Sequence, residues 1–169
     1  LPAVPGSKSC VKAGDSNGDG FMDLFVGGRV VPGRYPEAPA SYLLLNDGKG
    51  NFSDQTESIC KGLSRIGMVT DAVWIDLDLD KKQELVVAGE WMPLTVFTSE
   101  KGKLLNSTRQ YFGQSYPGFW NTISAGDFNG DGRADATAGA GYQHDFTLQH
   151  LRVAHACFHS SIADWKSPG

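Results

Sequence analysis

The sequence predicts an all-β fold made of about three four-stranded units, of the kind that form the blades of a β-propeller. An acidic, oxygen-rich segment starts at residues 15, 76 and 127, and a short apolar run follows each copy. The copies therefore recur after 61 and 51 residues, and repeats of this length with several short strands are typical of propeller blades. The 169 residues also include 21 glycines and 8 prolines, which suits a turn-rich β protein better than a helical one.

The strands of each unit can be placed relative to its acidic segment. Strands are expected directly after the acidic segments, at 24–28, 85–89 and 136–139. Second strands are expected at 42–45 and 94–97, with glycine-containing hairpin turns after them at 46–52 and 99–104. Further strands should lead into the second and third acidic segments, at 71–75 and 122–126. No helical periodicity stands out before residue 140.

The three acidic segments share one nine-residue pattern, with oxygen-bearing side chains at positions 1, 3, 5 and 9. These candidate ligands are Asp15, Asn17, Asp19 and Asp23 in the first segment, Asp76, Asp78, Asp80 and Glu84 in the second, and Asp127, Asn129, Asp131 and Asp135 in the third. The backbone carbonyl at position 7 would add a ligand, from Phe21, Lys82 and Arg133. Gly20 and Gly132 at position 6 permit a sharp turn, because glycine adopts positive φ without steric cost.

This ligand pattern favours Ca²⁺. Carboxylates crowded into nine residues repel one another unless a cation lies between them, and Ca²⁺ accepts many oxygens in flexible geometry. Mg²⁺ requires a stricter octahedron, and no thiolate or imidazole is placed to favour zinc or copper. An EF-hand would have glutamate at position 12 between two helices, whereas Val26, Val87 and Ala138 stand there in apolar runs. The alternative is that these segments are ordinary acidic hairpin turns.

The second acidic segment is the weakest of the three candidate sites. Lys81 replaces the glycine at position 6, and Lys82 adds a second positive charge beside the ligands. Four carboxylates nevertheless remain in this segment, so we expect it to bind calcium as well.

Composition and charge limit the binding partners and the cellular compartment that we expect. The formal net charge is −4 and no basic patch is visible, so nucleic acid is not an expected partner. No stretch of about 20 apolar residues is present, so no membrane span is predicted. The chain starts with Leu1, and we expect it to be a piece of a longer protein. Calcium sites of low affinity suit an extracellular, cell-surface or periplasmic location, where calcium is abundant.

Further stretches outside the acidic segments carry a family resemblance. They are residues 23–29, 31–36, 44–52, 67–74, 89–97 and 118–121. With the acidic segments, they resemble the FG-GAP/VCBS repeat proteins, close to the bacterial branch of cartilage-acidic-protein-like and ASPIC/UnbV-associated chains. The resemblance covers about residues 10–139.

The resemblance implies a seven-bladed propeller, the fold shared with the integrin α-subunit head, with calcium in the acidic loops. Three units cannot close such a ring, so the remaining propeller blades of a longer parent chain are expected partners. The family pattern would also continue with another strand and blade after the third loop. Instead, Gly141 opens a segment without a further acidic loop.

We therefore expect two parts, a propeller segment at 1–140 and an atypical tail at 141–169. The tail holds all four histidines together with one cysteine: His144, His150, His155, His159 and Cys157. A zinc site is one interpretation, but the spacing fits no tight signature, so a terminal extension, a foreign coding end or a poorly ordered segment is preferred. A helix at 148–158 stays open. Among the three cysteines, a Cys10–Cys60 disulfide also stays open, although we expect no structural disulfide.

Aromatic and basic residues give two weaker candidate sites. Trp74, Trp91, Phe119 and Trp120 could form a platform for a sugar or peptide, but packing between blades is the commoner role of such residues. Arg29 and Arg34 could bind an anion near the first loop, although solvated or ion-paired roles are expected.

The predicted function is non-catalytic. The sequence contains no Gly-x-Ser-x-Gly elbow, phosphate-binding loop, His-Glu-x-x-His motif or dinucleotide fingerprint. We expect a calcium-binding propeller module for extracellular adhesion or for interaction with a protein or glycan. The alternatives are a structural spacer and the propeller scaffold of a secreted carbohydrate-active or other hydrolytic enzyme, because fold does not fix function.

Overall fold

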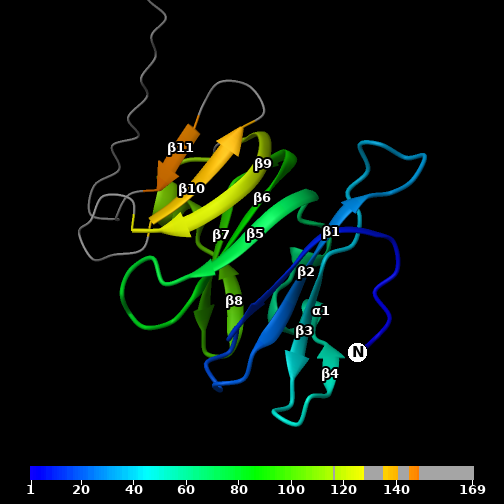
Figure 1. The fold of residues 1–169 in the computed structure, drawn as a ribbon, viewed down its shortest axis with the longest axis vertical. Coiled ribbons are helices and arrows are strands. Elements are labelled where there is room, and N and C mark those ends of the chain that lie inside the picture. The colour runs from blue at the N-terminus through cyan, green and yellow to red at the C-terminus, as the bar shows by residue number, and fades with distance from the viewer. Residues whose placement is uncertain (116, 128–134, 141–144, 149–169) are drawn as a thin grey trace, which may run out of the picture.

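The computed structural model describes residues 1–115, 117–127, 135–140 and 145–148, which form antiparallel β-sheets (Figure 1). The first unit contains β1 (Ser7–Gly14), β2 (Asp23–Val30), β3 (Tyr42–Asn46) and β4 (Phe52–Asp54). The second contains β5 (Met68–Ile75), β6 (Glu84–Pro93), β7 (Thr95–Glu100) and β8 (Lys103–Asn106). The third contributes β9 (Pro117–Gly126), β10 (Asp135–Ala140) and β11 (Asp145–Leu148). The prediction of an all-β fold built from four-stranded, blade-like units is confirmed.

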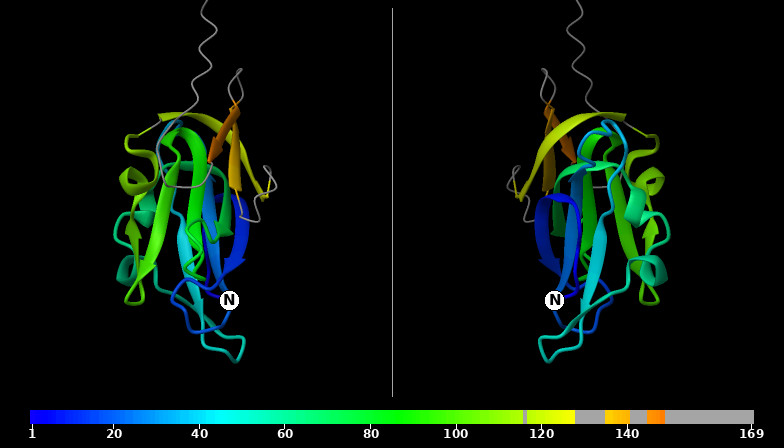
Figure 2. Two further views of the ribbon diagram at one scale, coloured as in Figure 1. Left: turned by 90° about the vertical axis from the view of Figure 1, so that its left-hand side faces the viewer. Right: turned by 90° about the vertical axis from the view of Figure 1, so that its right-hand side faces the viewer.

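Strand order is the same in successive units. The first sheet runs β1-β2-β3-β4, and the second unit runs β5-β6-β7-β8 with the same antiparallel pairing. In the third unit β9 pairs with β10, and β10 pairs with β11. One end of β9 also pairs with the far end of β6, so the second and third units share a continuous sheet. Figure 2 shows β9, in yellow, curving over one end of the second unit.

Each acidic segment joins the first two strands of its unit. The first connects β1 to β2, the second connects β5 to β6, and the third lies between β9 and β10. The strands predicted on both sides of the second and third segments fall within β5, β6, β9 and β10. β1 was not among the predicted strands, because its alternation of lysine, serine and small residues gives a weak apolar signal.

Two buried clusters hold the three units together. Each unit has an apolar sheet face that packs against the next unit, as in other repeat architectures. The cluster between the first two units contains Phe25, Leu43, Cys60, Leu63, Val69, Ala72, Trp74, Leu85, Val87, Met92, Phe97 and Leu104. The second cluster contains Ile75, Leu77, Val86, Ala88, Leu94, Val96, Tyr111, Phe112, Trp120, Ile123, Ala136 and Ala138. Because β6 contributes to both clusters, it forms the centre of the described fold.

One carboxylate also links all three units. Asp71 on β5 lies 2.8 Å from the Lys12 ammonium on β1. It also accepts hydrogen bonds from the Thr122 hydroxyl and the Ile123 backbone N–H on β9, each at 3.1 Å. Asp71 therefore fixes the first strands of the three units relative to one another.

Short helical turns differ from the sequence expectation of strands alone. Helix α1 (Thr56–Ile59) and the 3₁₀ helix η1 (Leu63–Arg65) follow the first sheet, and α2 (Thr108–Phe112) follows β8. Each is too short to produce a helical repeat in the sequence. The predicted hairpin between β7 and β8 is present, with Lys101 and Gly102 at φ of 51° and 74°. Two adjacent positive φ values are those of a type I′ turn.

In each of the first two units, a buried threonine hydroxyl accepts a hydrogen bond from the backbone of the third strand. Thr56 Oγ1 accepts a hydrogen bond from the backbone N–H of Leu43 at 2.9 Å, and Thr108 Oγ1 accepts one from Val96 at 3.1 Å. Leu43 lies in β3 and Val96 in β7, which are equivalent strands. The helical turn after each sheet is thus anchored to the third strand of its own unit.

Replacing Thr108 by Val is expected to lower the free energy of unfolding by about 1–2 kcal/mol, because the buried Val96 N–H would lose its acceptor. Thr108→Ser keeps the hydroxyl and serves as the matched control. Urea unfolding followed by tryptophan fluorescence measures both variants. Equal destabilisation by Val and Ser would show that the methyl group, not the hydrogen bond, is responsible.

Candidate metal centres in the acidic loops

The first acidic loop is folded by its own carboxylates. Asp15 accepts hydrogen bonds from the backbone N–H groups of Gly18, at 2.7 Å, and Gly20, at 2.8 Å. Asp19 accepts one from Phe21 at 2.8 Å. The loop thus turns its main chain around three closely spaced oxygen-bearing residues, the third of which is Asn17.

Position 9 of the first loop is buried and joins the loop to the sheet. Asp23 is fully buried and accepts hydrogen bonds from the backbone N–H and the hydroxyl of Ser16. Its other carboxylate oxygen accepts the backbone N–H of Asn46, at the end of β3, at 2.9 Å. Sequence reasoning missed Ser16 and Asn46, since neither occupies a ligand position.

The second loop repeats this hydrogen-bond pattern position by position. Asp76 accepts from the N–H groups of Leu79, at 2.7 Å, and Lys81, at 3.0 Å. Glu84 accepts from Leu77 N–H at 2.7 Å, as Asp23 does from Ser16. At position 7, the Lys82 ammonium lies 3.6 Å from the Asp80 carboxylate. The lysines therefore leave the loop fold unchanged.

The shared loop fold requires positive φ at positions 4 and 6. In the first loop these residues are Gly18 and Gly20, with φ of 82° and 86°. In the second loop they are Leu79 and Lys81, with φ of 66° and 70°. Because residues with a Cβ are strained in the left-handed region, the second loop holds backbone strain that the first loop avoids.

Lys81→Gly is therefore expected to raise the free energy of unfolding by about 1 kcal/mol, since glycine adopts this φ without strain. The neighbouring Lys82→Gly removes the same charge at a residue without positive φ, and we expect it to be neutral or destabilising. Chemical denaturation of both variants in chelator compares them. If Lys81→Gly lowered the free energy of unfolding, the interpretation of backbone strain at Lys81 would be wrong.

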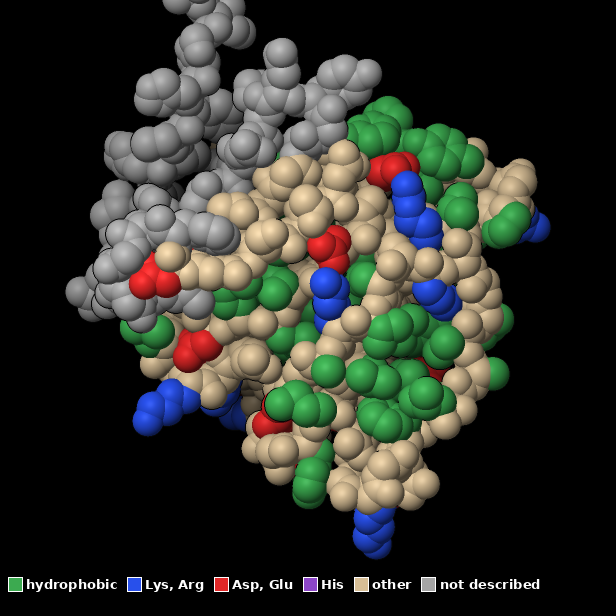
Figure 3. Space-filling view, in the orientation of Figure 1, with side chains coloured by type: hydrophobic (Ala, Val, Ile, Leu, Met, Phe, Trp, Pro, Cys, Tyr) green, Lys and Arg blue, Asp and Glu red, His purple; other side chains and the backbone are tan. Residues whose placement is uncertain are grey.

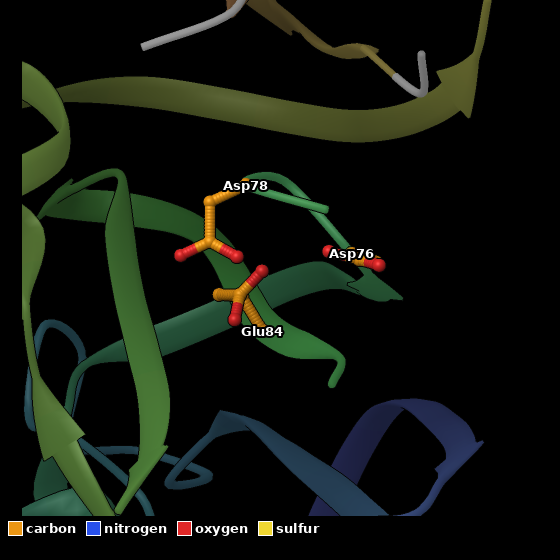
Figure 4. Close-up of side chains that lie close together, drawn as sticks. All are labelled: Asp76, Asp78 and Glu84. Carbon is orange, nitrogen blue, oxygen red and sulfur yellow. The ribbon is translucent and has the colours of Figure 1, made fainter. Parts of the chain in front are cut away.

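Three carboxylates of the second loop converge. Oxygens of Asp76, Asp78 and Glu84 all lie within 4.8 Å of one another. Among the described residues, this is the one group of three or more acidic, histidine or cysteine side chains with such spacing. Figure 4 shows the carboxylates of Asp78 and Glu84 pointing toward one another, with Asp76 beside them. The cluster has the oxygen chemistry that Ca²⁺ prefers.

The electrostatics of this cluster favour a bound cation. Burial first, and then the negative charges of Asp78, Asp80 and Asp76, raise the pKa of Glu84 to about 7, although the hydrogen bond from Leu77 N–H opposes the rise. Tyr111, from α2, donates a hydrogen bond to Asp78 at 3.2 Å, and burial followed by the charge of Glu84 raises the pKa of its hydroxyl. Tyr111 lies far from the loop in sequence, so no sequence signal could have found it.

The third loop is described only at its two ends. Asp127 follows β9, and Asp135 is the buried first residue of β10, as Asp23 is of β2 and Glu84 is of β6. The remaining predicted ligands, Asn129, Asp131 and Arg133, lie outside the described residues. The position-9 carboxylate is therefore buried at the start of the second strand in all three units.

The two weaker candidate sites from the sequence are the aromatic platform and the pair of arginines. Trp74 and Trp120 are buried in the core, whereas Trp91 and Phe119 are exposed, so the four aromatic residues do not form one platform. Arg29 pairs with Glu90, and Arg34 with Glu37, as expected for ion-paired arginines.

The remaining expectations concern the disulfide state of the cysteines and the histidine-rich tail. Cys10 and Cys60 are free thiols, and burial raises the pKa of Cys60 to about 11. The four histidines and Cys157 lie outside the described residues. β11, however, lies within the segment 141–169 that the sequence assigns to a tail.

Comparison with known proteins agrees with the repeat geometry. A family model for FG-GAP-like repeats matches residues 15–87 and again 76–136, and each match starts at an acidic loop. A search of the curated proteins found no match. No helix in the described part of the chain is long and apolar enough to cross a membrane. Such repeats are typical of extracellular or surface proteins and of propeller-like interaction modules. The two matches together span more than half of the sequence, so this chain belongs to the FG-GAP-like repeat family.

Proposed function

We propose that this chain is a non-catalytic, calcium-binding propeller module, located outside the cytosol, that interacts with a protein or glycan. The convergence of Asp76, Asp78 and Glu84 within 4.8 Å carries the calcium assignment. When ionised, these carboxylates repel one another, and a divalent cation coordinated by their oxygens would remove that repulsion. The first loop supports the same role, because it has the same backbone hydrogen-bond pattern.

Calcium would act on the rigidity of the units. Each acidic loop joins the two strands that begin a unit, and its position-9 carboxylate is buried at the start of the second strand. An ion held by positions 1, 3 and 5 together with position 9 would fasten the exposed loop to the buried sheet. A rigid set of blades suits adhesion, since less conformational entropy is lost when a partner binds.

Calorimetric titration with Ca²⁺ tests the assignment. We expect three sites, and Asp19→Ala, Asp78→Ala and Asp131→Ala should each remove one of them. Glu100→Gln at the exposed end of β7 changes one carboxylate outside the loops and should leave the stoichiometry unchanged. If all three loop variants bound as much calcium as the native chain, the assignment would be wrong.

The second site should depend on pH. The pKa of Glu84 is raised from 4.5 to about 7 in the folded chain, so the folded state holds this proton more tightly than the unfolded state. In chelator, this group therefore stabilises the fold below about pH 4.5, and the contribution is lost as pH rises through about 7. Calcium binding requires the ionised carboxylate, so affinity at this site should fall as pH drops below 7.

Thermal melts in chelator at pH 5.5 and pH 8, compared with calcium titrations at the same pH values, measure the two opposite trends. Glu84→Gln cannot ionise and is the matched control. Identical pH dependence in the native and Gln chains would contradict the role of Glu84.

A further inference from the structure

Three exposed aromatic side chains, one from each unit, meet at the end of the blades opposite the acidic loops. Trp91 lies near the far end of β6, which starts at the second acidic loop. Phe119 lies near the start of β9, which ends at the third loop, and Tyr35 lies between β2 and β3. The Trp91 and Phe119 rings pack edge to face, with centroids 4.3 Å apart and planes at 70°. The Trp91 indole N–H donates a hydrogen bond to the Tyr35 hydroxyl.

These three residues, named here the aromatic patch, are open to solvent. Trp91 is 64% exposed, Tyr35 57% and Phe119 38%. Figure 3 shows hydrophobic side chains gathered at the upper right of the molecule, beside one acidic and one basic side chain. Exposed aromatic groups that contact one another, rather than being scattered singly, mark an interaction surface.

The backbone holds Trp91 outward at an energetic cost. Its φ is 56°, a strained value for a bulky residue. The pairing of β6 with β9 steps from Glu90 opposite Phe119 to Met92 opposite Gly118, so Trp91 is the extra residue of a β-bulge. Bulges of this kind re-aim a side chain. The strained backbone places an exposed ring against the two other exposed aromatic residues rather than in the core, which indicates a binding role.

The charges around the aromatic patch select an anionic ligand. Arg29 pairs with Glu90, the residue before Trp91. Arg34, which precedes Tyr35, and Arg65 share a single partner, Glu37, at 3.2 Å and 4.0 Å. In these ion pairs, three guanidinium groups share two carboxylates. Aromatic rings alone would also attract a cation, but the excess positive charge disfavours one.

We propose that the aromatic patch binds an acidic polysaccharide built from uronic acid residues. The apolar C–H face of a sugar ring packs flat on an aromatic ring, and the Trp91–Phe119 corner offers two ring faces. The carboxylates of the polysaccharide would pair with Arg34 and Arg65, since a guanidinium binds a carboxylate through two parallel hydrogen bonds. This inference rests on the proposed interaction function and specifies its ligand class.

The test uses a β-1,4-linked glucuronate hexamer and cellohexaose, which differ only in their carboxylates. Titrated into the full chain at constant calcium, the glucuronate hexamer should bind, and cellohexaose should bind about tenfold more weakly or not at all. Trp91→Gly removes the ring and relieves the positive φ, so it should fold normally yet weaken glucuronate binding about tenfold or more. Arg34→Gln combined with Arg65→Gln should weaken it and reduce its salt dependence.

Lys101→Gly is the matched control, because it also replaces an exposed residue of positive φ with glycine, but in the β7–β8 hairpin, outside the acidic loops and at the opposite end of the blades. It should leave glucuronate binding unchanged. Equal binding of the two oligomers, absence of binding to either, or unchanged binding by Trp91→Gly would overturn the inference. A native dimer that Trp91→Gly dissociates would also overturn it, since a second copy would then cover the aromatic patch.

The two proposals fail separately. Calcium stoichiometry depends on the acidic loops, and glucuronate binding depends on residues at the other end of β6. A chain that binds three calcium ions but no glucuronate contradicts only the ligand class. A chain that binds no calcium contradicts the calcium module whatever its sugar binding.

Discussion

Removal of calcium is expected to lower the melting temperature of this chain by about 15–30 °C. A ligand at a hundredfold excess over its Kd stabilises the folded state by about 2.7 kcal/mol per site, so the three expected sites together would supply about 8 kcal/mol. For a chain of this size, each kcal/mol shifts the melting temperature by about 2–4 °C. The physical source is the relief of carboxylate repulsion, most directly around the converging Asp76, Asp78 and Glu84.

Differential scanning calorimetry in saturating calcium, in chelator, and in chelator with excess magnesium measures this effect. Magnesium should restore little of the lost stability, because the loops supply a flexible set of oxygens rather than a strict octahedron. If chelation changed the melting temperature by less than about 2 °C, the loops would be ordinary turns rather than calcium sites.

The second large effect is expected at Asp23. Asp23→Ala should lower the free energy of unfolding by about 3 kcal/mol or more even in chelator, because three donors from Ser16 and Asn46 would lose their buried acceptor. The same change should also abolish the first calcium site. Asp23 would thus contribute to stability both with and without the ion.

Asp19→Ala separates the two contributions. Asp19 belongs to the same loop, but its hydrogen bonds are exposed. In chelator we expect a loss of about 0.5 kcal/mol or less, as for most surface substitutions. In saturating calcium, the loss in the free energy of unfolding should approach the contribution of one bound ion. Urea unfolding of both variants, in calcium and in chelator, measures these losses. Equal losses for Asp19→Ala and Asp23→Ala in chelator would contradict the stabilising role of the buried Asp23 carboxylate.

The sequence predicts the acidic loops well because their spacing is local. Positions 1, 3, 5 and 9 lie within nine residues, so neither the ligand pattern nor the adjoining strands depend on distant contacts. The strand β1 escapes prediction because its side chains alternate weakly in hydrophobicity. The helical turns α1 and α2 escape because they are shorter than the period that would reveal them.

Other features depend on contacts that a single sequence does not encode locally. Trp74 and Trp91 look equivalent in sequence, but Trp74 is buried on β5, whereas Trp91 is exposed at the bulge in β6. Tyr111 reaches Asp78 from another part of the chain. The left-handed conformation of Leu79 and Lys81 follows from a loop fold imposed by Asp76, against the preference of either residue.

The pairing of β9 with β6 has a mechanical consequence. Main-chain hydrogen bonds connect the second and third units, whereas the described first unit forms a separate sheet that contacts the second through side chains. Under a pulling force, a junction of packed side chains yields before a strand ladder that is loaded along its length. Among the described units, the first would therefore separate before the second and third, which makes its junction the one most sensitive to tension.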